Sequence, residues 1–442
     1  MFYRSSFVLL ALSLVAVACP AVAAEYPVAD ATISLKVGDP LKRSLSLRGE
    51  WTGDLAEPSP VLDGATLRVA GAYGEGGTDV LALVGAAWRT LPNGRGFKYV
   101  DRNGSAGGIR SILLRPGRNG HPGMIKISGK NLDYDYRDTH SILRASLEIG
   151  LDRWCVEVPV TEDDGSRIDG EALAAPVDCP ADIVVEASWL DARLAHPDVQ
   201  VIDTRSSFSG GHIPGALPLR PEQLATTIEG IDYQMMPAEL AGPVLSGIGL
   251  RRDATVVVVG VSPEFDAARV TWALHYLGHP DVRYLDGGWN AWVAAGGETM
   301  PGSPVAGTAT TYVADPLRSE VRTTGDVVLT QIGAPPYDAP TIQLVDARSN
   351  GEFTTGHIPS ATFRPWTDNL ASGRLKARAD LEDLYTGLGL DPDQPTVTYC
   401  LVGWRASVSW LALQWLGFED VRIYDGSWTE WGAGGFPVET GS

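Results

Sequence analysis

Two regions of this chain carry the same short motifs in the same order. The run Asp286-Gly-Gly-Trp-Asn-Ala-Trp292 corresponds to Asp425-Gly-Ser-Trp-Thr-Glu-Trp431 at a spacing of 139 residues. A repeat of this length indicates a duplicated domain rather than a short repeating unit. In each region apolar, strand-like runs alternate with helical runs, which predicts a doubly wound α/β fold with a parallel sheet. We place the first copy at residues 183–305 and the second copy at residues 318–440.

The second copy holds one cysteine, at the end of a predicted strand. Thr396-Val-Thr-Tyr399 is an apolar run, Cys400 follows it, and a helical run begins at Ala406 after a loop with Gly403 near its middle. Backbone N–H groups of such a loop, together with the positive end of a helix, favour an anion. Arg405 adds a positive charge, so the surroundings favour the thiolate, the reactive form of cysteine. We predict that Cys400 is a nucleophile; the alternative is an inert, buried cysteine.

The motifs around this loop resemble the rhodanese family of sulfurtransferases, and the two copies together resemble a tandem rhodanese. The resemblance rests on four motifs in the second copy: Val345-Asp-Ala-Arg348, Gly356-His-Ile-Pro-Ser-Ala361, the Cys400 loop and Tyr424-Asp-Gly-Ser-Trp-Thr-Glu-Trp431. It implies a cysteine that takes a sulfane sulfur, holds it as a persulfide and passes it to a nucleophile, without a metal or an organic cofactor. It also implies a substrate-binding loop that consists of Leu401, Val402, Gly403, Trp404 and Arg405.

The first copy lacks the chemical groups of this loop. The spacing of 139 residues places Val261 opposite Cys400, and places two acids, Glu264 and Asp266, opposite the glycine and the arginine of the second copy. Acidic side chains disfavour a thiolate and repel an anionic donor. We therefore predict that the first copy is catalytically silent, and that it packs against the second copy and forms a wall of the Cys400 cleft.

Three motif residues of the second copy recur in the first. The counterparts of Asp346, Arg348 and His357 are Asp203, Arg205 and His212. A residue that is shared with a copy lacking the cysteine is expected to support the fold. We therefore predict structural roles for these three residues of the second copy; the alternative for His357 is a proton shuttle beside Cys400.

The length and composition of the loop bear on the sulfur donor. Phosphatases that this architecture resembles use Cys-x5-Arg, whereas this chain has Cys-x4-Arg, a smaller ring that suits a sulfane sulfur rather than a phosphate. Thiosulfate is the predicted donor, and 3-mercaptopyruvate is the second choice. Leu401 and Val402 match the residues that the resemblance implies for neither donor, and Glu352 stands where those enzymes have an arginine. An apolar rim that includes Trp404 suits a bulkier donor, such as a protein persulfide.

A non-enzymatic function is the alternative. The duplicated domains would then form an exported binding scaffold or a persulfide carrier. A persulfide that forms on Cys400 and is transferred would exclude the scaffold. The net charge of −19 argues against nucleic acid as a partner, because no basic stripe is present to follow a phosphate backbone.

Residues 1–24 carry the pattern of an export signal. Arg4 provides a positive start, an apolar run extends from Phe7 to Val17, and small residues near the end of the segment offer a cleavage site. The run is too short for a membrane span, and no other apolar run reaches that length. Cys19 follows a poor version of a lipoprotein motif, so we do not expect a lipid anchor. We predict a periplasmic or secreted protein.

Residues 25–165 show short apolar or alternating runs, such as Ile109-Arg-Ser-Ile-Leu-Leu-Arg115, separated by Asn-Gly turns. This pattern predicts an all-β, sandwich-like domain ahead of the two α/β domains. Residues 166–182 are rich in Asp, Gly, Ala and Pro, which predicts a linker. In an oxidising compartment Cys155 and Cys179 are expected to form a disulfide, which leaves Cys400 as the unpaired thiol.

Overall fold

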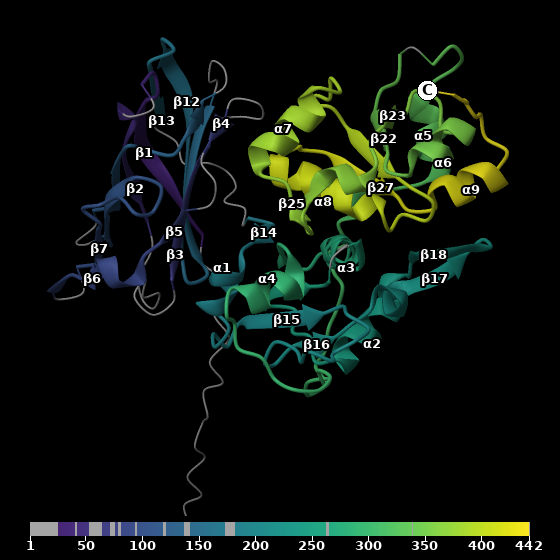
Figure 1. Cartoon of the computed structure of the whole chain (residues 1–442), viewed down its shortest axis with the longest axis horizontal. Helices are drawn as coiled ribbons and strands as arrows, with labels where there is room; N and C mark the ends of the chain where they lie inside the picture. Colours follow the sequence, from purple (N-terminus) through teal and green to yellow (C-terminus); the bar gives the residue numbers. More distant parts are fainter. Residues whose placement is uncertain are drawn as a thin grey trace, which may run out of the picture.

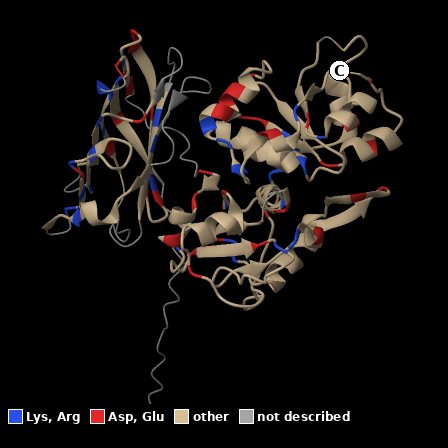
Figure 2. Cartoon of the chain, viewed as in Figure 1, with Lys and Arg blue, Asp and Glu red and all other residues tan. Residues whose placement is uncertain are grey.

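The computed structural model describes residues 25–441 apart from 40–41, 53–63, 71–75, 78–80, 93–94, 118–120, 137–141, 173–181, 262–264 and 338. It contains a β-rich unit followed by the two α/β copies (Figure 1). The predicted signal segment, with Cys19, lies outside the described residues. Among the described residues, no helix has the length and apolar character needed to cross a membrane. Acidic and basic residues are interspersed in all three units (Figure 2).

The β-rich unit is built from one continuous sheet. Its strands within the described residues are β1 (Glu25–Lys36), β2 (Ser44–Trp51), β3 (Ala65–Ala70), β4 (Gly76–Gly77), β5 (Leu81–Leu83), β6 (Trp88–Thr90), β7 (Phe97–Val100), β8 (Ile109–Arg115), β9 (Gly123–Lys130), β10 (Asp135–Tyr136), β11 (Ile142–Ile149), β12 (Asp152–Asp163) and β13 (Arg167–Ala172). Their order is β10-β4-β3-β11-β12-β13-β1-β2-β9-β8-β7-β6, with β5 paired to β3. Buried and exposed side chains alternate along β2 and β9, as in strands that turn one face to a core.

This sheet encloses one apolar core because β1 pairs in both of its halves. β1 runs parallel to β12 at its start and antiparallel to β2 and β13 further along. Tyr26, Trp51 and Trp154 pack together at the centre, with ring centroids 4.8, 5.0 and 5.6 Å apart. Leu67 on β3 and Ile112 on β8 belong to the same buried cluster. The structure thus confirms the predicted all-β domain.

The segment predicted as a linker, residues 166–182, begins with a strand. β13 pairs antiparallel with β1 over six residues, so the β-rich unit extends to Ala172 instead of ending at residue 165. Ile168 and Gly170 face inward on this strand and their neighbours face outward. The Asp and Gly content suggested a linker, but alternation and pairing with β1 decide the local structure here.

The two cysteines that we expect to pair lie close to this boundary. Cys155 is buried on β12. Cys179 falls within residues 173–181, outside the described residues. The Cys155–Cys179 disulfide therefore remains a prediction.

The two α/β copies share one sheet topology. The first copy has β14 (Val184–Val185), β15 (Val199–Asp203), β16 (Leu217–Pro218), β19 (Thr255–Val259) and β20 (Asp281–Leu285); the second has β21 (Arg322–Thr323), β22 (Gln343–Asp346), β23 (Thr362–Phe363), β26 (Thr396–Tyr399) and β27 (Val421–Tyr424). The parallel orders are β14-β20-β19-β15-β16 and β21-β27-β26-β22-β23. The central strands β19 and β26 are buried throughout, as parallel strands covered on both faces must be. The predicted doubly wound fold is confirmed.

Helices and one hairpin complete each copy. The first copy has α1 (Ala187–Asp191), α2 (Ala238–Gly247), α3 (Phe265–Tyr276), α4 (Gly288–Ala294) and the hairpin β17 (Ala225–Ile228) and β18 (Ile231–Met235). The second has α5 (Gly325–Ile332), α6 (Asn350–Thr355), α7 (Arg378–Thr386), α8 (Ala406–Leu416), α9 (Ser427–Ala433) and the hairpin β24 (Leu370–Ala371) and β25 (Arg374–Leu375). Each hairpin contacts the other copy.

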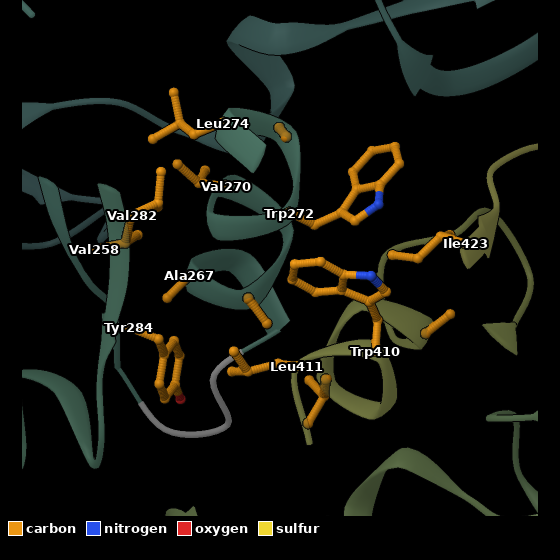
Figure 3. Packing of buried hydrophobic residues seen from close by; sticks show 14 of the residues in the cluster. Val258, Ala267, Val270, Trp272, Leu274, Val282, Tyr284, Trp410, Leu411 and Ile423 are labelled. Carbon is orange, nitrogen blue, oxygen red and sulfur yellow. The ribbon is translucent and has the colours of Figure 1, made fainter. Parts of the chain in front are cut away.

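The two copies share one hydrophobic core, with α3 and α8 at its centre. α8 is buried from Ala406 to Leu413, as expected for a helix inside a protein. Trp272 of α3 and Trp410 of α8 belong to one cluster with residues of both sheets (Figure 3). Each indole N–H donates to a backbone carbonyl at 3.0 Å, so both rings are buried with their polar atom satisfied.

Each copy also holds the hairpin of the other with an aspartate of the repeated Asp-Gly motif. The Met235 N–H of β18 donates to the Asp425 carboxylate at 2.8 Å, and the Leu375 N–H of β25 donates to the Asp286 carboxylate at 2.8 Å. Arg269 on α3 adds an ion pair to Asp425 at 2.6 Å. The interface between the copies is therefore pseudosymmetric, with each copy donating and accepting the same contact.

The β-rich unit docks on the first copy through a buried polar network. Glu148 on β11 accepts hydrogen bonds from the Trp189 indole at 2.7 Å and from Arg283 at 2.9 Å, and all three side chains are buried. Each of these groups has a partner, as buried charges require. A cavity of about 440 Å³ lies beside this network where the three units meet, and no residue of the Cys400 loop lines it.

Candidate active site

Cys400 lies at the carboxyl end of β26, in the middle of the sheet of the second copy. The side chain is a free cysteine with 1% exposure. Its backbone N–H donates to the Ser427 hydroxyl at 3.1 Å, and its carbonyl accepts from the Trp428 N–H at 3.0 Å. The carboxyl edge of a parallel sheet is where α/β proteins gather their binding groups. The structure therefore places the predicted nucleophile at the edge where a substrate site is expected.

The cysteine loop turns sharply at Gly403. This residue has a φ of +79°, in the left-handed region that favours glycine. A Cβ atom here would lie 2.9 Å from the Asp425 carbonyl oxygen, closer than side chains tolerate. The Ser407 hydroxyl donates to the Gly403 carbonyl at 3.1 Å, and α8 begins at Ala406. The N-terminus of α8 therefore lies directly behind the loop, where the positive end of the helix dipole favours negative charge.

Arg405 is paired rather than free. Its two terminal nitrogens donate to the two carboxylate oxygens of Glu352 on α6, at 2.9 and 2.7 Å. The hydrogen bond from Arg405 is the main cause that lowers the pKa of Glu352 to about 2, so this carboxylate stays ionised at neutral pH. The same hydrogen bond is the largest cause that raises the pKa of Arg405; burial acts in the opposite direction, and neighbouring Cys400 adds a smaller contribution to the rise. The sequence predicted Arg405 as a cation for the donor but did not predict that Glu352 offsets its charge.

The rim of the loop combines residues of both copies. The Trp404 indole donates to the Tyr233 carbonyl at 3.3 Å, and the two rings meet edge to face at 5.3 Å between centroids. Tyr233 lies on the hairpin strand β18 of the first copy and has a φ of +66°, which residues other than glycine rarely adopt. Leu401 is 44% exposed, and Val402 is half-buried. The first copy thus borders the Cys400 loop, as the sequence led us to expect.

Asp346 and Arg348 lie beneath the site and connect its elements. Their side chains form a two-armed ion pair with a shortest N–O distance of 2.6 Å, and Arg348 also donates to the Gly356 carbonyl at 2.7 Å. The Tyr399 hydroxyl donates to Asp346 at 2.6 Å. Burial, and then the charge of Asp346, raise the pKa of Tyr399 well above its usual value, so this hydroxyl remains a donor.

The ion pair recurs in the first copy without the tyrosine contact, because the spacing of 139 residues places Gly260 opposite Tyr399. Asp203 and Arg205 form an ion pair with an N–O distance of 2.7 Å. The guanidinium of Arg205 lies 4.0 Å from the Trp289 ring, and that of Arg348 lies 4.3 Å from the Trp428 ring. A copy that has no cysteine keeps this ion pair, which is consistent with the predicted structural role of Asp346 and Arg348.

His357 also makes the contacts of a structural residue. Its Nδ1 lies 3.0 Å from the Phe353 carbonyl, its ring stacks on the Phe353 ring at 3.8 Å, and its backbone pairs with Glu439. His212 pairs with Met300 in the same way in the first copy. Each histidine therefore fastens the segment that follows the last helix of its copy to the rest of the domain.

The first copy presents different groups where the second has its cysteine loop. Val261 is 47% exposed, and Asp266 lies 3.5 Å from Arg220. Burial raises the pKa of Asp266. Glu264 lies outside the described residues. Residues 183–305 contain no cysteine, so this copy has no thiol for sulfur transfer.

Sequence analysis did not single out Ser427 and Tyr233. The sequence offered a clue to Ser427, because this residue lies in the motif Asp425-Gly-Ser-Trp428 that is matched in part in the first copy. Tyr233 had none, because it reaches the loop through a hairpin of the other copy. Within the part of the chain that the structure describes, no group of three or more His, Cys, Asp or Glu side chains is arranged to hold a metal ion.

Comparison with known proteins identifies the class. A model of the Rhodanese-like domain matches residues 186–295 and 331–433. The thiosulfate sulfurtransferase of Corynebacterium glutamicum is 35% identical over 283 residues, which is 58% of this chain and 90% of that protein. The crystal structure of SseA from Escherichia coli, described as a 3-mercaptopyruvate sulfotransferase, is 26% identical with a TM-score of 0.51 and covers 56% of this chain and 99% of its own. The YnjE structure shares the fold, with 24% identity, a TM-score of 0.51, and coverage of 59% of this chain and 68% of its own.

The fold and the cysteine loop therefore define a sulfurtransferase, and the chain belongs to the rhodanese family. Within that family it is a tandem form, with both copies matched by the family model and a β-rich unit ahead of the first matched segment.

Proposed function

We propose that this protein is an exported sulfurtransferase that moves a sulfane sulfur to a thiophilic acceptor through a persulfide on Cys400. The observation that carries the proposal is the position of Cys400 at the start of a short loop, directly after β26, with Gly403 in the left-handed region and the start of α8 behind the loop. Thiosulfate is the first donor to consider and 3-mercaptopyruvate the second, in line with the activities named for the relatives.

The first half of the reaction loads the cysteine. The Cys400 thiolate attacks the sulfane sulfur of the donor, and a new S–S bond forms to its Sγ. With thiosulfate, the S–S bond of the donor breaks and sulfite leaves with the electron pair. N–H groups of the loop hold the negative charge of the donor and of the departing group, and the positive end of the α8 dipole adds to this. Arg405 contributes as a member of its pair with Glu352.

The second half of the reaction transfers the sulfur from Cys400 to an acceptor. The persulfide rests in the same loop, and the loop N–H groups stabilise its outer sulfur as an anion. An acceptor such as cyanide attacks the outer sulfur, the S–S bond breaks, and the thiolate of Cys400 returns. Tyr233 and Trp404 form the rim that the acceptor passes. Neither step requires a metal or an organic cofactor.

Export is part of this proposal and is supported by the sequence of residues 1–24, with its positive start and apolar run. In an oxidising compartment a free thiol is unusual. Persulfide chemistry requires a free thiol at Cys400, which accounts for a cysteine that is not part of a disulfide. Detection of the mature protein in a periplasmic or culture-medium fraction of cells that express the full chain tests this point, and retention in the cytoplasm would contradict it.

A second candidate is a non-enzymatic scaffold or persulfide carrier. The observation that favours it is the 1% exposure of Cys400, because a buried thiol can also be inert. Alkylation of the folded protein distinguishes the two: a thiol that reacts with iodoacetamide faster than in the unfolded chain supports the enzyme, and a thiol that stays unmodified until unfolding supports the scaffold.

Sulfur transfer to cyanide tests the main proposal. The mature protein and Cys400→Ser are compared with thiosulfate and with 3-mercaptopyruvate. We expect turnover that is absent from the variant, and a mass increase of one sulfur atom on Cys400 when the donor is supplied without an acceptor. A folded protein that neither turns over nor gains this sulfur would overturn the proposal.

A further inference from the structure

The ion pair between Arg405 and Glu352 is held by several hydrogen bonds. Both terminal nitrogens of Arg405 are engaged by Glu352, and the side chains of the pair are 25% and 33% exposed. The carboxylate is itself fixed from the other side, because the Ser349 hydroxyl and backbone N–H donate to its Oε2 at 2.6 and 2.9 Å. These four hydrogen bonds hold Glu352 at the N-terminus of α6.

This pairing changes the charge that a donor meets. The loop from Cys400 to Arg405 contains a single basic residue, and that residue faces a carboxylate of opposite charge. The pair is neutral as a whole, and the chain carries a net charge of −19. Arg269, which lies against Gly403, is likewise paired with a carboxylate, that of Asp425. Among the described residues, a thiosulfate dianion therefore relies mainly on backbone N–H groups of the loop and on the helix dipole of α8, with the Glu352 carboxylate nearby.

The rim around the same loop offers apolar contact instead. Leu401 and Tyr233 are 44% and 49% exposed, and Tyr233 meets Trp404 edge to face. Together they present two aromatic rings and an aliphatic side chain to anything that enters. An apolar group on a donor gains from removing this surface from water, whereas a sulfonate oxygen does not.

We propose that Glu352 is a specificity-determining residue that favours organic sulfane donors of single negative charge, such as thiosulfonates (R–SO2–S−), over thiosulfate. The inference rests on the proposed sulfurtransferase function. In the loading step the Cys400 thiolate bonds to the terminal sulfur of R–SO2–S−, the S–S bond of the donor breaks, and the sulfinate R–SO2− leaves with the electron pair. Charge and atoms balance, and no oxidant or reductant is needed.

Two small donors of similar shape separate the effect of donor charge from the effect of donor size. Methanethiosulfonate has the shape of thiosulfate, with a methyl group in place of one O−, so the two differ chiefly by one negative charge. We expect the wild-type protein to show a kcat/KM for methanethiosulfonate at least about tenfold above that for thiosulfate. In Glu352→Gln the side chain keeps its shape but loses its charge. The kcat/KM for thiosulfate should rise about tenfold, mainly through a lower KM, and that for methanethiosulfonate should change less than about threefold.

Glu222→Gln in the first copy is the matched control. Glu222 accepts from two nitrogens of Arg220, at 3.1 and 2.8 Å, so this substitution removes the same charge from a similar pair within the copy that lacks a cysteine. It should leave the ratio of the two donors unchanged. Circular dichroism and thermal unfolding verify that both variants are folded.

The outcomes separate the two proposals. If wild-type protein and Glu352→Gln form a Cys400 persulfide with both donors but keep the same donor ratio, the specificity role is wrong and the sulfurtransferase function stands. If no donor forms a persulfide in any folded variant, both proposals fail. A rise in thiosulfate activity that is equal in Glu222→Gln would assign the effect to net charge and would also overturn the role of Glu352.

Discussion

The two copies of the α/β domain share their sheet topology and their buried ion pairs, and they differ mainly in the loop that follows the central strand. Asp203 with Arg205 and Asp346 with Arg348 form the same buried pair at the same place in each sheet. At the end of the central strand, however, the second copy has Cys400 and the first has Val261. The comparison teaches that the family motifs shared by both copies describe the frame, and that the residues found in one copy alone describe the chemistry.

The largest expected difference between the copies is in catalysis. Cys400→Ser should lower sulfur transfer at least about a thousandfold, because a serine hydroxyl without a base is a far weaker nucleophile than a thiolate. Adding Val261→Cys to this variant should restore nothing, because Asp266 disfavours a thiolate where the second copy has an arginine. Thiocyanate formation measures both. Recovery of turnover in the double variant would show that the first copy can hold a reactive thiol.

The next largest effect should be equal in the two copies. Arg205→Met and Arg348→Met each leave a buried aspartate unpaired, and each should lower the free energy of unfolding by about 3–5 kcal/mol. Urea unfolding followed by tryptophan fluorescence measures this. The folded fraction of Arg205→Met should keep its kcat. A cost below about 1 kcal/mol in the first copy alone would contradict a shared frame.

Acid should weaken the first copy before the second. α3 ends near His275 and His279, where the second copy has Gln414 and Phe418. Burial lowers the pKa of both histidines to about 4. An unfolded chain protonates them near pH 6.5, so their contribution is intact above pH 6.5 and is lost as pH falls from 6.5 to about 4, at a cost of about 3 kcal/mol for each group.

The melting temperature between pH 7.5 and pH 4.5 tests this dependence. His275→Gln, which copies the residue of the second copy, should flatten the profile. A profile identical to that of the wild type would mean that His275 titrates equally in the folded and unfolded states.

The smallest effect concerns the turn itself. Gly403→Ala should cost about 2 kcal/mol and reduce activity, because its φ is +79° and a Cβ meets the Asp425 carbonyl. Gly247→Ala at the end of α2 is the matched control in the first copy, since a Cβ there meets nothing within 4 Å. It should be neutral or stabilise by up to about 1 kcal/mol. Equal destabilisation by both would remove the special role of the Gly403 turn.

Much of the frame could be predicted from the sequence because its signals are local. The apolar run before Cys400, the helix from Ala406 and the repeated Asp-Gly motifs each lie within a few residues of one another. Strand β13 was missed for the opposite reason. Its Asp and Gly residues are typical of a loop, and only pairing with β1, more than a hundred residues earlier, makes the segment a strand.

The residues of the cysteine loop could be named from the sequence, but the pairing of Arg405 with Glu352 could not. Arg405 and Glu352 are 53 residues apart in the chain and lie on different elements, so no local pattern shows that they pair. The contact between Tyr233 and Trp404 joins two copies across 171 residues. Both relationships depend on how β26, α6 and the β17–β18 hairpin are brought together in space.

The exchanged hairpins have a consequence for how such a chain can change over generations. Asp425 lies against the cysteine loop and at the same time holds Met235 of the first copy, while Asp286 of the first copy holds Leu375 of the second. After duplication, either copy was free to lose its reactive groups. Each copy must still keep its Asp-Gly motif in place, because Asp425 and Asp286 accept the hydrogen bonds of the hairpin in the other copy. Loss of the first copy would therefore remove a hydrogen-bond acceptor and part of the shared core from the copy that carries Cys400.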